Sequence, residues 1–372
     1  MRPPLDVLAA TAERPLMARA GLTHFGGCDY LGLSRHPRLI RSAQEAAARW
    51  GLSTSASRTT TGNTPVHDEL EAALEVFFQS ALLGRRATLT LDGLTANIAA
   101  LEAVGGPDAT AIIDERAHRS LTLAARAAGC HVVRFRHADA ADARRAIDVA
   151  GGAPVVVITD GVFTAGGRIA PLPELLEAAP KDGMLLVDEC HGLGVLGEGG
   201  RGAVAHFGID DSRIVITSTL AKGMGAGGGF VLAPPGVHDR MRSASTAFVG
   251  TTPISPVVAA AACESIRVID DEPWRLQRLR ENASLLERTL AAAGMLDRPE
   301  GDEPIPIAAI PVPSAEREAA LGDAWRRASI DVPCMGYPGG PGARYFRISV
   351  TAEHSPDDVE RLTRAVRDAS GE

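Results

Sequence analysis

The stretch "STLAKGMGAGGG" (218–229) contains one of only two lysines in a chain whose lysines and arginines together number 38. The other, Lys181, lies in "APKDG", which is typical of an exposed turn. A lysine amine can act as a Schiff-base nucleophile, whereas a guanidinium cannot. The glycines after Lys222 allow the backbone to approach a ligand closely. We therefore predict that position 222 requires an amine and not only a positive charge.

A nucleotide-binding loop is the main alternative for the same stretch. Residues 223–228, "GMGAGG", match the G-x-G-x-x-G pattern. That pattern binds dinucleotides only where it opens a helix, and here the apolar run "FVLAP" follows instead. A phosphate-binding Walker loop would need Gly before the lysine and Ser or Thr after it, and both are absent. The pattern therefore argues against both kinds of nucleotide site.

Three further motifs place reactive groups directly after apolar runs. In "LLVDECHGLGVLG" (185–197) an apolar run ends in Asp188, and His191 follows. In "DERAHRSL" (114–121) His118 stands at the start of a helical pattern, and "LDGLTAN" (91–97) places Gly93 at another helix start. Helix N-termini bind phosphate through free N–H groups. Taken singly, each motif also fits a structural role, such as a turn cap or a locally packed histidine.

Taken together, the four segments follow strands that we expect to be parallel. Ligands of such sheets bind outside the carboxyl ends of the strands. An amine, a carboxylate, imidazoles and a phosphate cradle are the groups that pyridoxal 5'-phosphate (PLP) requires. A PLP site is therefore the chemistry that this combination favours.

The strands that position these groups are short, apolar and continuous. We expect them at 87–91, 109–114, 131–135, 154–159, 184–189, 213–218 and 229–234. Helical patterns lie between them near 95–105, 119–129, 138–149 and 172–180. Continuous hydrophobicity with alternating helices predicts an α/β fold with a mainly parallel seven-stranded sheet. The last strand follows without room for a helix, so we predict that one strand is antiparallel.

The flanking segments indicate further helices and a second, smaller domain. Helical patterns begin at about Pro37 and within "GNTPVHDELEAALEVFF", and a long helix is expected around 255–270. The amphipathic run "EPWRLQRLRENASLLERTLAAAG" follows, with Gly294 as its expected C-cap. Strands at 305–312 and 344–350 and helices near 316–328 and 356–369 complete the pattern. We predict an N-terminal arm (1–40), a large PLP-binding domain (41–250) and a small α+β domain (251–372).

Composition excludes several classes of function. The net charge is −8 and no basic run occurs, which argues against a nucleic-acid partner. The sequence contains no run of 18 apolar residues, so we predict no membrane span. The N-terminus lacks the pattern of a signal peptide. The cysteines are scattered and never form C-x-x-C, which fits a cytoplasmic protein without disulfides or a metal site. They are Cys28, Cys130, Cys190, Cys263 and Cys334.

Nearly the whole chain resembles the α-oxoamine synthase family of fold-type I PLP enzymes. The resemblance is carried by "DYLGL", "HDELEAAL", "TDGVFTAGG", "DECHGLGVLGEGGRG", "TLAK" and "TAEHSP". It implies a biosynthetic acyltransferase that condenses an amino acid with an acyl thioester, on CoA or a carrier protein, with decarboxylation to an α-amino ketone. It also implies a homodimer with shared active sites.

The resemblance implies a role in cofactor binding for each motif residue. Lys222 would bond to PLP and take the Cα proton, Asp188 would pair with the pyridinium nitrogen, and His191 would contact the phenolic oxygen. His118 would stack on the ring. The phosphate would be held by the N–H groups of residues 93 and 94, a hydroxyl at 219 and a hydroxyl from the neighbouring subunit. These positions are Gly93, Leu94, Thr219 and Thr252.

The substrate side of the pattern departs from the family. Arg347 matches the arginine that binds the substrate carboxylate, and Thr164 stands where the family has a serine near the cofactor. Cys28 replaces the asparagine that helps to hold that carboxylate, and Ala117 replaces another asparagine. An aromatic residue is common at the position of Leu94. Cys28 and Ala117 leave an aldolase, a decarboxylase and an aminotransferase open as alternatives. A non-catalytic subunit of the same fold is a further alternative, against which the retention of Lys222 argues.

Overall fold

A computed structural model describes residues 17–19, 21–296, 303–336 and 339–370. The described chain forms two compact units. The larger unit contains residues 36–163 and 169–273, and the smaller unit contains the described residues before 36, residues 164–168 and the chain from Trp274 onward.

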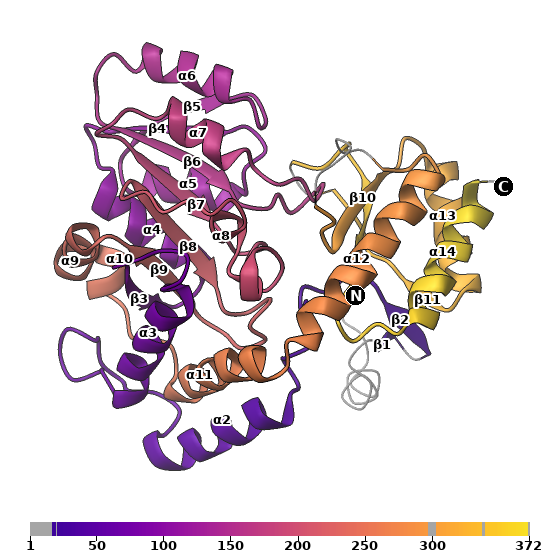
Figure 1. The fold of residues 1–372 in the computed structure, drawn as a ribbon, viewed down its shortest axis with the longest axis horizontal. Coiled ribbons are helices and arrows are strands. Elements are labelled where there is room, and N and C mark those ends of the chain that lie inside the picture. Colours follow the sequence, from indigo (N-terminus) through magenta and orange to yellow (C-terminus); the bar gives the residue numbers. More distant parts are fainter. Residues whose placement is uncertain (1–16, 20, 297–302, 337–338, 371–372) are drawn as a thin grey trace. The chain divides into compact units, whose positions relative to one another are not determined.

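The larger unit is built around a seven-stranded sheet in the order β3-β9-β8-β7-β6-β4-β5 (Figure 1). Strands β5, β4, β6, β7 and β8 are parallel, whereas β9 is antiparallel to both β8 and β3. The expectation of a mainly parallel sheet with an antiparallel strand is thus confirmed. The strands are β3 (Arg86–Thr90), β4 (Thr110–Asp114), β5 (His131–Phe135), β6 (Val155–Asp160), β7 (Met184–Asp188), β8 (Ile214–Thr219) and β9 (Gly229–Ala233).

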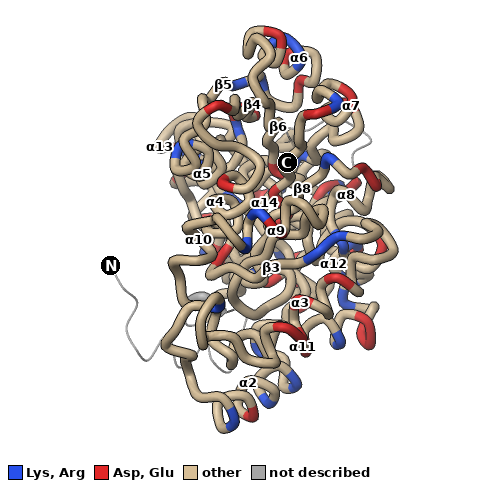
Figure 2. Tube along the Cα trace, turned by 90° about the vertical axis from the view of Figure 1, so that its left-hand side faces the viewer, with Lys and Arg blue, Asp and Glu red and all other residues tan. Residues whose placement is uncertain are grey.

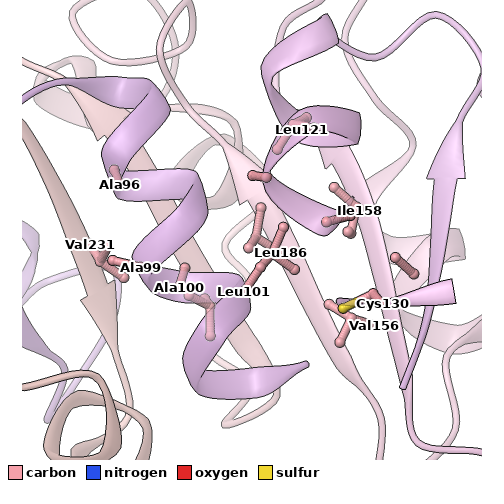
Figure 3. Packing of buried hydrophobic residues seen from close by; sticks show 14 of the residues in the cluster. Ala96, Ala99, Ala100, Leu101, Leu121, Cys130, Val156, Ile158, Leu186 and Val231 are labelled. Carbon is pink, nitrogen blue, oxygen red and sulfur yellow. The ribbon is translucent and has the colours of Figure 1, made fainter. Parts of the chain in front are cut away.

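Helices pack against this sheet because its central strands are buried along their whole length, as in β4, β6, β8 and β9. Helices α4 (Gly93–Val104) and α5 (Arg119–Ala127) contact each other, and α4 also contacts β8 and β9. Figure 3 shows Ala96, Ala99, Ala100 and Leu101 of α4 in the same cluster as Val231 and Leu186 of the sheet. Their small side chains let α4 approach the strands closely. Helix α6 (Ala140–Val149) contacts α7 (Leu172–Ala178), β4 and β5.

Local sequence explains where the helices begin. Asp92 caps α4 by accepting a hydrogen bond from the Thr95 N–H, and the Thr95 hydroxyl bonds back to Asp92. Helices α2 (Pro37–Trp50) and α3 (Pro65–Phe78) each begin with a proline, whose ring suits the first helical position. The start of α4 at Gly93 therefore follows from residues 92 and 95.

Helix α11 (Pro256–Asp271) belongs to the larger unit because it packs on α2 and α3. The compact units divide between Pro273 and Trp274. The domain limits given above (1–40, 41–250 and 251–372) remain a prediction. The other short elements of this unit are a 3₁₀ turn (Glu198–Gly200), α8 (Ala203–His206), α9 (Pro235–Ala244) and α10 (Thr246–Val249).

The described residues of the smaller unit form two three-stranded sheets and three helices. One sheet has the order β1-β2-β11 and the other β10-β13-β12. Phe25, Leu286, Trp325 and Ile348 lie in its hydrophobic core. Its elements are β1 (Met17–Arg19), β2 (Leu22–His24), α12 (Trp274–Ala292), β10 (Ile307–Pro311), α13 (Ala315–Arg327), β11 (Ile330–Asp331), β12 (Cys334–Met335), β13 (Tyr345–Ser349) and α14 (Pro356–Ser370).

Acidic and basic residues are interspersed along the trace of the chain (Figure 2). Within the residues that the structure describes, none of the helices combines the length and the apolar character that a bilayer crossing requires.

Candidate active site

The reactive groups of the larger unit lie where strands of the sheet end. Asp160, Asp188 and Thr219 are the last residues of β6, β7 and β8. Asp160 is paired in register with Asp188, and Thr219 is paired with Gly229, the first residue of β9. These residues therefore lie along one edge of the sheet, the one formed by the carboxyl ends of its parallel strands, where open α/β sheets bind ligands.

Lys222 lies three residues after β8, and its amine contacts an imidazole. The distance from Lys222 Nζ to His191 Nε2 is 2.8 Å. The loop that carries Lys222 packs closely on the segment that carries His191. A Cβ on residue 223 would lie 2.3 Å from the Leu193 carbonyl oxygen, so only glycine fits there. The glycine thus permits contact between two backbone segments, those that carry Lys222 and His191. We had attributed the glycines to approach by a ligand, and at position 223 the close neighbour is protein backbone.

Asp188 is a buried carboxylate that accepts two hydrogen bonds. Asn97 Nδ2 donates to one oxygen and the Cys190 N–H donates to the other, each at 2.9 Å. Only 3 % of Asp188 is exposed. A carboxylate oriented by two donors in this way can pair with a protonated ring nitrogen.

His118 is the N-cap of α5, and its ring lies at the same edge of the sheet. Its Nδ1 lies 2.6 Å from Ser120 Oγ, and its backbone N–H donates to Asp160 at 2.8 Å. Burial lowers the pKa of His118, and the carboxylate of Asp188 opposes that change. The geometry therefore favours a neutral imidazole.

Two other buried carboxyls lie beside Asp188. Burial raises the pKa of Asp160 well above its ordinary value, and the charge of Asp188 adds to the effect. Burial raises the pKa of Glu189 to about 7, although the N–H groups of Ala203 and Val204 act against it. Asp188 thus stands between two carboxyls whose pKa values burial has raised.

The predicted phosphate cradle contains Gly93 and Leu94 in the first turn of α4. A Cβ at position 93 would lie 2.9 Å from the sulfur of Cys190, so the glycine keeps this helix start open. The Thr219 hydroxyl donates to the Gly228 carbonyl at 2.9 Å and accepts from the Ala221 N–H. It would have to leave Gly228 to donate to a phosphate. Thr252 is exposed.

A second group of predicted residues lies within the smaller unit. Arg347 is buried, and its Nε donates to the Thr164 carbonyl at 2.9 Å. Its terminal nitrogens lie 3.1 Å from Ser349 Oγ and 3.7 Å from the sulfur of Cys28. Burial raises the pKa of the neighbouring Tyr30 well above its ordinary value. Among the described residues no Asp or Glu forms an ion pair with Arg347, so this buried cation can receive an anion.

The residues present fit PLP. Lys222 offers the amine, Asp188 the buried carboxylate, His191 and His118 the imidazoles, and α4 a helix start that only glycine keeps open. The structure brings all of these together at one edge of the sheet. The sequence prediction missed three residues that connect them, namely Asn97, Ser120 and Thr217. An asparagine between apolar residues of α4, in the run "ANIAAL" (96–101), was the available signal.

Comparisons with known proteins point to one family. Residues 21–366 match the family model described as aminotransferase class I and II. An 8-amino-7-oxononanoate synthase of Polaromonas naphthalenivorans is 36% identical over 356 residues, which are 94% of this chain and 87% of that protein. One from Mycolicibacterium gilvum is 35% identical over 369 residues, or 97% and 93% of the two chains.

Solved structures are similar as well. A serine palmitoyltransferase from S. paucimobilis with a bound PLP–myriocin aldimine has a TM-score of 0.86 and 27% identity, over 94% of this chain and 87% of that one. The matches extend along nearly the full length of both proteins. The chain therefore belongs to the α-oxoamine synthases, the PLP-dependent acyltransferases within the class I and II aminotransferase family.

Proposed function

We propose that this enzyme joins an amino acid to an acyl thioester, with loss of carbon dioxide, and forms an α-amino ketone. The Cα–H bond breaks, a bond from Cα to the acyl carbon forms, and the thiol leaves from CoA or from a carrier protein. The Cα–carboxylate bond then breaks, carbon dioxide leaves, and Cα takes up a proton. The observation that carries the proposal is the amine of Lys222, 2.8 Å from His191, beside the buried Asp188. When bound, PLP supplies an electron sink for the pair left at Cα.

The residues of this chain then have distinct tasks. Lys222 would hold PLP through its amine and, when displaced by the substrate, would take the Cα proton. Asp188 would hold the proton of the pyridinium nitrogen in place, and His191 would orient the phenolic oxygen. His118 would cover the ring, and the first N–H groups of α4 would hold the phosphate.

Two further features of the proposal concern the assembly and its location. The exposed Thr252 would reach the phosphate of a second copy, so that a homodimer would share its two sites. We place the enzyme in the cytoplasm, because five unpaired cysteines fit a reducing compartment.

The test is a titration of the PLP-loaded protein with single amino acids and then with acyl thioesters. We expect one amino acid to change the visible absorption, and a thioester then to release free thiol and carbon dioxide in equal amounts. An amino acid that changes the spectrum while every thioester stays intact would move the assignment to an aldolase, decarboxylase or aminotransferase. A protein that never binds PLP in a coloured form would indicate a non-catalytic subunit.

Replacing Arg347 by lysine is expected to weaken binding of the amino acid. A lysine keeps the charge but loses the planar pair of donors that binds a carboxylate in a bidentate manner. Charge-assisted hydrogen bonds contribute roughly 1.5–3 kcal/mol, so we expect KM for the amino acid to rise roughly 10- to 150-fold. The KM for the thioester should change little.

Arg344→Lys is the matched control, since Arg344 immediately precedes β13 and pairs with Glu318 on the surface. Its kinetics should equal those of the wild type. Equal amino-acid KM values for Arg347→Lys and Arg344→Lys would remove Arg347 from the substrate site.

A further inference from the structure

A buried asparagine links three elements of the larger unit at the edge where the site lies. Asn97 of α4 is fully buried. Its Nδ2 lies 2.9 Å from Asp188 Oδ2 at the end of β7 and 3.2 Å from Ser120 Oγ of α5. Its Oδ1 lies 2.5 Å from Thr217 Oγ1 of β8. The single side-chain amide of Asn97 thus makes all three contacts.

The chemistry of the partners sets the direction of each bond. A carboxylate accepts only, so the atom of Asn97 that faces Asp188 must be the nitrogen. The second N–H of the same amide then points to Ser120 Oγ, which accepts it. The amide oxygen is left for the hydroxyl of Thr217, which donates. Asp188 thus fixes the orientation of the whole amide.

The same reasoning continues from Ser120 to the ring of His118. The backbone N–H of Ser120 donates to Nδ1 at 3.3 Å, which requires a lone pair on that nitrogen. The Ser120 oxygen accepts from Asn97, and its own hydrogen can then turn to Nδ1, 2.6 Å away, as a second donor. A proton on Nδ1 would instead face the hydrogen of that backbone N–H.

We propose that Asn97 and Ser120 are positioning residues that hold His118 as the neutral tautomer with its proton on Nε2. A hydrogen-bond relay connects this tautomer to the carboxylate of Asp188. His118 is then a hydrogen-bond donor through Nε2–H and not a cationic acid. The meaning of this tautomer for catalysis rests on the proposed function, whereas the tautomer itself follows from the hydrogen bonds alone.

The charged groups around His118 agree with a neutral ring. Asp188 on β7 favours the cation, whereas Lys222 in the loop after β8 and Arg119 on α5 disfavour it. Asp160 on β6 accepts from the backbone of His118, not from its ring. Burial makes the largest contribution and lowers the pKa of the ring, in the direction that the relay requires.

The test is ¹⁵N NMR of the PLP-loaded protein with labelled histidine, without substrate, with the His118 signals assigned from a His118→Gln variant. At neutral pH we expect an unprotonated Nδ1 and a protonated Nε2. Ser120→Ala removes one donor to Nδ1 and should make protonation of His118 easier by roughly 2- to 13-fold. The acid dissociation constant that sets the acidic limb of the kcat profile should fall by the same factor, which moves that limb to higher pH.

Two comparisons separate the relay from a structural effect. Ser218→Ala is the matched control, because the buried Ser218 hydroxyl on β8 has no hydrogen-bond partner among the described residues; its spectrum and pH profile should stay unchanged. Asn97→Asp keeps the shape of the side chain but turns its donor into an acceptor, so it should disturb His118 as Ser120→Ala does.

A protonated Nδ1 in the wild type would overturn the proposal. So would a Ser120→Ala spectrum and pH profile equal to those of Ser218→Ala. Absence of thiol release from every thioester would instead contradict only the proposed function, since the ring nitrogens are observed without substrate.

Discussion

Lys222→Ala should lower the rate of thiol release by about 10³-fold or more. Two contributions are lost together, the covalent hold on PLP and the base that takes the Cα proton, and general-base catalysis alone contributes about 10²- to 10⁴-fold. The protein should still fold, because Lys222 lies in the loop after β8 and its side chain is only half-buried. The measurements are thiol release and the visible absorption of the protein after incubation with PLP.

Lys222→Arg distinguishes the amine from the charge. The arginine keeps a positive charge at the position that contacts His191, but its guanidinium cannot form a covalent bond with an aldehyde. We therefore expect a loss of activity as large as that in Lys222→Ala. Lys181→Arg should behave as the wild type. Substantial activity in Lys222→Arg would contradict our assignment of this lysine as the amine that holds PLP.

Acid should destabilise the smaller unit through His354. This ring is fully buried, stacks on Phe25 with centroids 4.2 Å apart, and accepts at Nδ1 from the Thr351 N–H at 2.9 Å. Nε2 therefore carries the proton and bonds to the His24 carbonyl at 3.1 Å. Burial lowers the pKa of His354 to about 4, against about 6.5 for an unfolded histidine.

The sign of the effect follows from these two pKa values. The folded state prefers the neutral ring, so its full advantage exists above about pH 6.5 and is lost as the pH falls toward 4. We expect the free energy of unfolding to fall by about 2 kcal/mol at pH 5 and about 3 kcal/mol at pH 4 from this group. Urea unfolding at several pH values measures it.

His354→Gln should be less stable at pH 7.5 but should lose less of its remaining stability toward pH 5. His131→Gln on β5, where the side chain is exposed, should follow the wild type at every pH. Parallel pH curves for the wild type and His354→Gln would show that His354 does not cause the loss of stability in acid.

The sheet could be predicted from the sequence because each strand is a short, apolar run. The expected strand at 131–135 coincides with β5, and the absence of a helix before 229 identified β9 as antiparallel. Strands of two residues, such as β11 and β12, carry no comparable signal, because so short a segment shows no periodicity. The partner of β11 is also distant in sequence, since Ile330 pairs with Thr23. The packing of α11 on α2, across about 200 residues of sequence, likewise depends on contacts that a local pattern does not show.

The candidate site was predictable as a set of groups but not as a network. Lys222, Asp188 and His191 were evident from residue type and position after a strand. Asn97 was part of the motif "LDGLTAN", yet its partners Ser120 and Asp188 are 23 and 91 residues away in sequence. Hydrogen bonds of this range depend on the packing of α4 against the sheet, which periodicity alone does not specify.

The place of β3 at the edge of the sheet has a consequence for how the chain is made. Among the described strands β3 pairs only with β9, so Thr90 has no strand partner until Gly229 is made, 139 residues later (229 − 90). At ribosomal rates of about 5–20 residues per second, that interval is roughly 7 to 28 s. During this time the strand that leads into α4 has no partner in the sheet. The segment that contributes Gly93 and Asn97 to the site is thus among the first to be synthesised, yet its strand pairs only when the last strand of the sheet has emerged.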